Sequence, residues 1–218
     1  MNTITVAAPS RGTTTTPAAR PDADTSSAPA SGPLVVAVTG SPSEHSMSTA
    51  AALGVLDGLE AAGFQVRHLP VRELPADGLV HGRRDQPRIR AALELIDRAH
   101  GVVVATPIYQ TSFSGLLKTF LDLLRRDALA GKTVLPTATA GTLAHLLGVE
   151  YGLTPVLRAL GATCTKGLFL LEDAFERPGP SSPGPSSPGC HLGPDAVDRT
   201  RKAANDFAAM MTSGARNR

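Results

Sequence analysis

The segment GSPSEHSMST, from Gly40 to Thr49, places five hydroxyl side chains directly after an apolar run typical of a strand. It turns on a glycine and enters a segment with a helical pattern. The first N–H groups of a helix have no intrahelical partner and carry partial positive charge, so this position suits a phosphate group. Ser41, Ser46, Ser48 and Thr49 add donors around it. We predict a phosphate-binding loop, with the alternative that one hydroxyl merely caps the helix.

The spacing within this loop excludes two common nucleotide-binding motifs. A P-loop requires GxxxxGK[ST], and a dinucleotide fingerprint requires GxGxxG. Neither pattern occurs in the loop. A mononucleotide phosphate is therefore a better fit than a triphosphate or a pyrophosphate.

Apolar runs typical of buried strands alternate with helical patterns along most of the chain. The predicted strands are Leu34–Val38, Phe64–His68, Gly101–Ala105, Thr133–Ala138 and Leu168–Leu171. The predicted helices are Ser48–Ala62, a helix opened by Pro87, Ser114–Arg125, Val149–Leu160 and Pro194–Met211. This alternation predicts an α/β fold with a doubly wound, five-stranded parallel sheet and helices on both faces. Ligands of such sheets bind beyond the carboxyl ends of the strands, which points to the loops after the first, third and fourth strands.

Two tracts are too poor in large apolar side chains to offset the entropy of ordering them. Residues 1–33 consist mainly of Thr, Ala, Pro, Ser, Gly and Arg, and residues 177–189 repeat Gly-Pro-Ser-Ser-Pro. We predict a disordered N-terminal arm, one domain over residues 34–213 with a flexible insertion at 177–189, and a short tail at 214–218.

Composition narrows the class of protein. The 21 Lys and Arg residues nearly balance the 19 Asp and Glu residues, so nothing points to nucleic acid as a partner. Cys164 and Cys190 lack metal-ligand spacing and are too few for a disulfide scaffold. Neither an apolar span of about 18 residues nor a secretory signal is present. We expect a soluble, cytoplasmic protein without a metal site.

Three segments, in order, resemble the NAD(P)H-dependent FMN reductases that supply reduced flavin to two-component monooxygenases, above all the branch that serves alkanesulfonate monooxygenases. They are Gly40-Ser41-Pro42 with Ser46 and Ser48, ATPIYQTSFSGLLK from Ala105 to Lys118, and LPTATAGTLAHLL from Leu135 to Leu147. The resemblance covers residues 34–172. It implies a flavodoxin-like fold, FMN with NADPH or NADH as cofactors, a monooxygenase that receives the reduced FMN, and assembly as a homodimer or homotetramer.

The resemblance implies cofactor-binding roles at ten positions. The phosphate positions are Ser41, Ser46, Ser48 and Thr49, the positions beside the isoalloxazine ring are Pro107, Ile108 and Tyr109, and those that complete the ring pocket are Thr139, Gly141 and Thr142. A flat apolar ring needs flat apolar neighbours, and its polar edge needs N–H donors from a glycine-containing turn.

The chain also departs from the family. Relatives often have arginine at the positions of Ser43 and Met47, and glycine at that of Ala140. The loss of positive charge weakens the attraction for phosphate, so we expect FMN to be held loosely. Loose binding suits a protein that passes its flavin on.

Hydride transfer from nicotinamide to flavin is chemistry of the two cofactors, so we predict no catalytic side chain. His145 has no carboxylate partner in the sequence pattern and is interpreted as structural. Arg83 and Arg84 could bind the 2′-phosphate of NADPH, but a solvated charge run is an equally simple interpretation. The choice between NADPH and NADH stays open.

Two other functions fit the same sequence. One is an enzyme that retains FMN and reduces a quinone, an azo compound or a metal oxyanion. The other is a flavodoxin-type electron carrier without enzymatic activity, although carriers are usually strongly acidic and this chain has a formal charge of +2.

The predicted helix after the third strand has an unusually broad apolar face. It carries Phe113, Leu116, Leu117, Phe120, Leu121, Leu123 and Leu124, which cover an arc of roughly 160° where roughly 100° is enough to face a core. A neighbouring helix of the same chain could cover the surplus, but the resemblance favours a partner subunit. We therefore predict a homodimer or homotetramer with Phe113 at or near the subunit contact.

Overall fold

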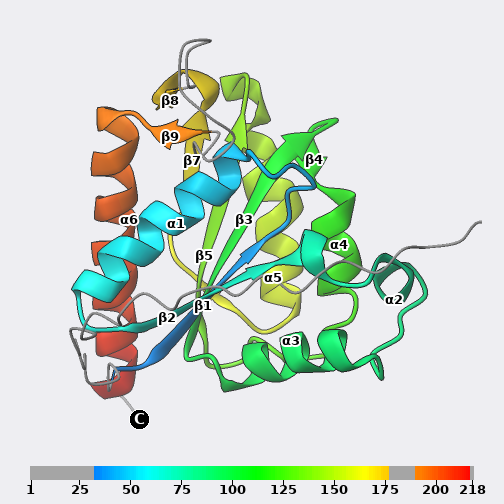
Figure 1. Cartoon of the computed structure of the whole chain (residues 1–218). Helices are drawn as coiled ribbons and strands as arrows, with labels where there is room; N and C mark the ends of the chain where they lie inside the picture. The colour runs from blue at the N-terminus through cyan, green and yellow to red at the C-terminus, as the bar shows by residue number, and fades with distance from the viewer. Residues whose placement is uncertain (1–31, 177–189, 217–218) are drawn as a thin grey trace, which may run out of the picture.

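A mostly parallel sheet between two layers of helices forms the centre of the computed structural model, which describes residues 32–176 and 190–216 (Figure 1). The strands of this sheet are β1 (Leu34–Thr39), β2 (Gln65–Pro70), β3 (Gly101–Tyr109), β4 (Ser112–Phe113), β5 (Thr133–Ala140), β6 (Thr163–Cys164) and β7 (Leu168–Leu171). Their order is β2-β1-β3-β5-β6, with β7 also paired to β5 and β4 paired antiparallel to β3. A small separate hairpin joins β8 (Phe175–Glu176) to β9 (His191–Leu192).

Helices cover both faces of the sheet. The α-helices are α1 (Met47–Ala61), α2 (Ala76–Val80), α3 (Pro87–Arg98), α4 (Gly115–Leu121), α5 (Thr154–Ala159) and α6 (Pro194–Arg216). Figure 1 shows α1 and α6 on one face and α3, α4 and α5 on the other. Each face has its own buried cluster: Leu59 and Phe207 lie in that of α1 and α6, whereas Ile96, Phe120 and Leu157 lie in the other.

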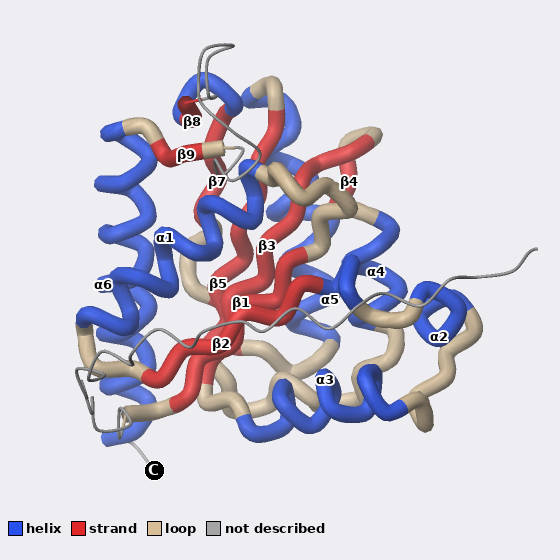
Figure 2. Tube along the Cα trace, viewed as in Figure 1, coloured by secondary structure: helices blue, strands red, loops and turns tan. Residues whose placement is uncertain are grey.

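Short elements lie where the chain leaves the carboxyl ends of the strands. They are the 3-10 turns η1 (Val71–Glu73), η2 (Leu143–His145) and η4 (Glu172–Ala174), and the single π-helical stretch η3 (Gly148–Leu153) that leads into α5. Most of these segments join loops at the edge that Figure 2 places at the top.

The predicted fold class is confirmed, with five principal strands and five principal helices at the predicted places. The ends of two helices differ from the predicted ends, because local contacts override the sequence pattern there. The helix expected to reach Arg125 ends at Leu121, and the backbone continues as turns in which Leu123 N–H donates to Phe120 O. The helix α6 continues to Arg216, beyond the expected domain end at 213. Of the arm predicted at residues 1–33, residues 1–31 lie outside the described residues, as does the insertion at 177–189.

The broad apolar face after β3 is largely covered by the chain itself. Leu117 and Phe120 are fully buried, Leu121 and Leu123 nearly so, and Phe113 is half-buried against the same core cluster. Other elements of the same layer pack against α4. They cover the apolar side chains that lie outside its core-facing stripe. Most of this face is therefore covered by neighbouring elements of the same chain, which was the alternative, so its breadth alone does not argue for a partner subunit. The subunit contact at Phe113 stays a prediction.

Within the described ranges, no helix has the length and apolarity needed to cross a membrane.

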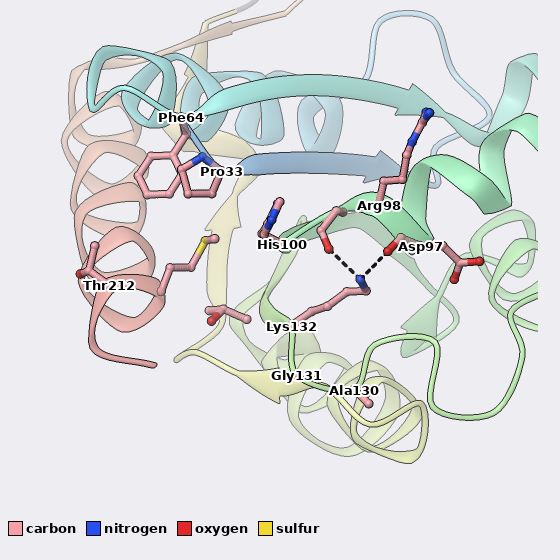
Figure 3. A pocket seen from close by; sticks show the side chains of 12 residues that line it. Pro33, Phe64, Asp97, Arg98, His100, Ala130, Gly131, Lys132 and Thr212 are labelled. Carbon is pink, nitrogen blue, oxygen red and sulfur yellow. Dashed lines mark hydrogen bonds between the residues drawn. The ribbon is translucent and has the colours of Figure 1, made fainter. Parts of the chain in front are cut away.

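A hollow of about 610 Å³ lies at the amino ends of β1 and β3, opposite the edge where ligands of such sheets bind (Figure 3). Lys132 lies in its wall, where Nζ donates to the carbonyl oxygens of Asp97 and Ala99 at 2.9 and 2.6 Å. Burial is the main cause that lowers the pKa of Lys132. The lysine closes the end of α3, so its role is structural.

We expect Lys132→Met to lower the free energy of unfolding by about 1–2 kcal/mol, because the last carbonyls of α3 lose a charged donor that is only partly exposed. Urea denaturation measures the change. The matched control is Lys118→Met, since Lys118 forms an exposed i,i+4 pair with Asp122 and should contribute less than about 0.5 kcal/mol. Equal effects of the two substitutions would contradict the capping role.

Candidate functional site

The loop after β1 surrounds the N-terminus of α1. Ser46 is the N-cap residue, and its Oγ accepts a hydrogen bond from Thr49 N–H at 3.3 Å. Ser41 is buried, and its Oγ accepts from Ser43 N–H at 3.2 Å. The first turn of α1 contains no acidic residue. The N–H groups of that turn therefore form an electropositive end at the carboxyl edge of the sheet.

The four predicted phosphate residues differ in their surroundings. Ser46 Oγ lies 2.9 Å from Ser48 Oγ, and Ser48 is fully buried. Ser48 thus supports the capping hydroxyl, while Ser41 and Ser46 are also buried and Thr49 is half-buried. The capping alternative raised by the sequence holds for Ser46, which leaves the backbone N–H groups as the main donors of this loop.

Ser114 connects the loop after β1 to the loop after β3. Its Oγ donates to Gly40 O at 2.5 Å and accepts from Leu117 N–H at 3.0 Å, so it also caps α4. Its own N–H donates to Thr106 Oγ1 at 3.0 Å. Both Ser114 and Thr106 are buried. This network fixes the two loops relative to each other, and sequence reasoning did not find it.

Gly40 lies so close to α4 that a side chain would not fit. A Cβ on Gly40 would stand 2.4 Å from Leu117 Cβ and 3.1 Å from Leu117 Cα. Its N–H donates to Ala105 O at 2.8 Å, as a continuation of the pairing between β1 and β3. The glycine therefore allows the phosphate loop to start directly against α4.

A tight hairpin extends β3 beyond the sheet and carries the predicted ring residues. Tyr109 pairs with Ser112 across Gln110 and Thr111, whose φ angles are 47° and 62°. Two successive left-handed residues form the type of turn that matches the twist of the strands, although non-glycine residues adopt it at a cost. Ile108 is buried, and Tyr109 is half exposed at the rim. The hairpin thus presents an aromatic face beyond the carboxyl end of β3.

The loop after β5 completes this edge. Thr139 pairs with Pro107 across the sheet and is almost fully buried. Gly141 and Thr142 are exposed, and Thr142 Oγ1 accepts from Ala144 N–H at 3.4 Å to start η2. A Cβ on Gly141 would come within 3.3 Å of Glu172 Oε1. The three predicted loops therefore converge at one edge of the sheet, as their strand order requires.

His145 follows this loop in η2 and is half-buried. Its Nδ1 is buried and has no hydrogen-bond partner among the described residues. The interpretation of His145 as a structural residue stays a prediction.

Arg83 and Arg84, the candidates for the 2′-phosphate of NADPH, are exposed after α2, where Arg83 N–H donates to Gly78 O and Arg84 N–H donates to Gly82 O. That role stays a prediction. Arg72, in η1, instead reaches the phosphate loop, with Nη1 3.5 Å from Glu44 Oε1. Sequence reasoning missed Arg72, although η1 follows β2 and β2 adjoins β1.

An exposed histidine, His68, lies in β2 beside this corner. His68 Nε2 is 2.9 Å from Thr39 Oγ1. Desolvation lowers the pKa of His68, with Arg72 acting in the same direction and Glu73 opposing it. This shift favours the neutral form of the imidazole.

This edge combines an electropositive helix end with an aromatic hairpin and a glycine-containing turn. Such an arrangement can hold a phosphate at one end of a ligand and a flat ring at the other. Among the described residues no cluster of His, Cys, Asp and Glu could hold a metal ion.

Comparison with known proteins agrees with this geometry. Residues 33–176 match the family model described as NADPH-dependent FMN reductase. An FMN reductase (NADPH) of Pseudomonas putida is 47% identical over 137 residues, which are 62% of this chain and 70% of that protein. An NADH-dependent FMN reductase, SfnF, of Pseudomonas fluorescens is 33% identical over 154 residues, which are 65% of this chain and 78% of that protein.

A solved structure shows the same fold. The apo form of the NADH:FMN oxidoreductase EMOB superimposes with a TM-score of 0.70 at 34% identity, covering 81% of this chain and 89% of that chain.

Proposed function

The chain belongs to the NADPH-dependent FMN reductase family, and we propose that it supplies reduced FMN to a separate flavin-dependent monooxygenase. It is an oxidoreductase that reduces FMN with a reduced nicotinamide cofactor. The likeness of its three loops to the branch that serves alkanesulfonate monooxygenases supports a recipient in sulfonate or related sulfur metabolism. The cytoplasm, where reduced nicotinamide is available, is the proposed location.

One observation carries the assignment of the site: the N-terminus of α1, capped by Ser46, opens at the same edge as the Tyr109 hairpin and the Gly141 turn. The fit to FMN follows from the donors. A phosphate dianion suits the helix end, which has no acid in its first turn. The ring suits an edge where Tyr109 is half exposed.

When bound, flavin and nicotinamide supply the hydride chemistry. The proposed work of the protein is to hold both in register. Ser41, Ser46 and the α1 N–H groups bind the phosphate, with Thr49 and Ser48 supporting the loop. Pro107, Ile108 and Tyr109 lie along one side of the ring, and Thr139, Gly141 and Thr142 close the other.

The test is NAD(P)H oxidation with added FMN, FAD or riboflavin. We expect turnover to require added flavin and to favour FMN over riboflavin, since riboflavin lacks the phosphate. The variant Ser41→Ala with Ser46→Gly should raise the KM for FMN about tenfold, because it removes two hydroxyls while glycine still tolerates the N-cap position. The control Ser43→Ala changes an exposed hydroxyl of the same loop. Equal KM values for FMN and riboflavin in the wild type would contradict the phosphate site.

The same preparation separates the alternative functions. A reductase that uses FMN as a substrate purifies nearly colourless, whereas one that retains FMN purifies yellow. An electron carrier would bind FMN without oxidising NADPH or NADH. Parallel assays with the two nicotinamides give the preference.

We also propose a homodimer or homotetramer that assembles beside the site. Four large apolar side chains are exposed there, and we call them the apolar patch: Tyr109 at 50%, Leu143 at 64%, Leu147 at 58% and Tyr151 at 78%. They come from the β3–β4 hairpin, η2 and the segment around η3. The last packs on the hairpin, because a Cβ on Gly148 would meet Thr111 O at 2.8 Å. Soluble monomers rarely expose such a patch.

A further inference from the structure

The phosphate loop lacks a cation of its own. Residues 40–49 contain one acid, Glu44, and no lysine or arginine. Its basic side chain is His45, which is exposed. A phosphate dianion at the end of α1 would therefore lie near the Glu44 carboxylate. Within this loop, only the helix end and neutral donors would attract the phosphate.

Arg72 lies in η1, directly after β2, and brings a positive charge to this loop. Thr39 and Pro70 are paired at the ends of β1 and β2, so the chain after β2 leaves the sheet beside the phosphate loop. Val71 is fully buried in the core cluster shared with α4, which anchors η1. Arg72 follows Val71 and keeps only 30% of its side chain exposed.

The guanidinium group is held by two carboxylates. Its Nη1 lies 3.5 Å from Glu44 Oε1, on the phosphate loop, and its Nη2 lies 3.6 Å from Glu73 Oε1, on its own turn. Both distances exceed those of a good charge-assisted hydrogen bond. Glu44 is far more exposed than Arg72, with 79% of its side chain accessible. This pair is therefore weak and can be exchanged for a stronger anion.

We propose that Arg72 binds the phosphate of FMN, and that Glu44 competes with the phosphate for the same guanidinium group. Arg72 thus takes the place of the arginines that the loop lacks at Ser43 and Met47. The Glu73 carboxylate, 3.6 Å from Nη2, keeps the guanidinium near the loop. Competition by Glu44 keeps FMN exchangeable, as a protein that releases its flavin requires.

The first experiment measures binding of FMN and riboflavin to the oxidised protein by quenching of flavin fluorescence. Arg72→Gln should weaken FMN binding about tenfold and leave riboflavin binding unchanged. The control is Arg67→Gln, which removes the same charge from β2, the strand that leads into η1, where Arg67 Nη1 donates to Val66 O. An equal loss in both variants would mean a diffuse charge effect and would overturn the proposal.

The second experiment separates direct binding from mere neutralisation of Glu44. Glu44→Gln should tighten FMN binding severalfold, because it removes the competitor. The double variant should stay about tenfold weaker than Glu44→Gln alone if Arg72 contacts the phosphate. If Arg72 only neutralises Glu44, the double variant should bind FMN as tightly as Glu44→Gln, and the proposal fails.

This inference rests on the proposed FMN site, and the two fail differently. A wild-type protein that binds neither flavin would overturn the site itself. A wild-type protein that prefers FMN, together with an unchanged Arg72→Gln variant, would overturn only the role of Arg72.

Discussion

Gly40→Ala should destabilise the protein by about 3 kcal/mol and abolish detectable FMN binding. A Cβ at 2.4 Å from Leu117 Cβ is incompatible with the present position of α4, and overpacked cores relax only at a cost of this order. When α4 moves, Ser114 loses its bond to Gly40 O, and the two loops separate. Urea denaturation and flavin fluorescence measure the two effects.

Gly115→Ala is the matched control. Gly115 opens the same helix, and a Cβ there meets no atom within 4 Å. Alanine is a better helix former than glycine, so stability should rise by about 0.5 kcal/mol or stay unchanged. If Gly40→Ala and Gly115→Ala had the same free energy of unfolding, the close approach of the loop to α4 would not contribute to stability.

The contrast between these glycines shows what the sequence could predict. The run Leu34–Val38 followed by Gly40 predicts a strand and a turn, because continuous apolar residues are buried in parallel sheets. It does not predict which helix lies against the turn. That contact depends on α4, more than 70 residues later in the chain, and on the Ser114–Gly40 bond with a sequence separation of 74.

Arg72 illustrates the same limit for the site. The sequence drew attention to Arg83 and Arg84 as possible ligands of the NADPH 2′-phosphate, but no motif marks Arg72. Strand order places the turn after β2 beside the loop after β1. The positive charge that we propose for the phosphate site therefore comes from Arg72, in that turn. Conversely, the convergence of the loops after β1, β3 and β5 was predictable, since parallel neighbours end at the same edge.

The breadth of the apolar face after β3 does not by itself indicate a subunit contact, because burial depends on all neighbours of a helix. Phe120 belongs to the core, whereas Leu147 and Tyr151 attracted no attention in the sequence and are exposed. Helical spacing also failed at residues 148–153, where the backbone forms a π-helical stretch. A π-helical stretch changes which residues share a face, so the face could not be derived from a period of 3.6 residues.

Leu147→Asp should therefore convert the proposed homodimer or homotetramer to smaller species at micromolar concentration. The substitution places a charge in the apolar patch, where it would be desolvated by a partner subunit. We expect the mass from light scattering to fall by a factor of about two or more, with the far-UV circular dichroism unchanged because Leu147 is 58% exposed in the single chain.

The matched control for assembly is Val80→Asp, because Val80 is 70% exposed on α2, outside the patch. This variant should keep the wild-type mass. It also separates a specific contact from a general gain in solubility, since both variants add one negative charge at an exposed apolar position. If the wild-type protein has a monomer mass, or if Val80→Asp dissociates the assembly as fully as Leu147→Asp, the apolar patch is not the subunit contact, and the exposure of Tyr109, Leu143 and Tyr151 requires another partner.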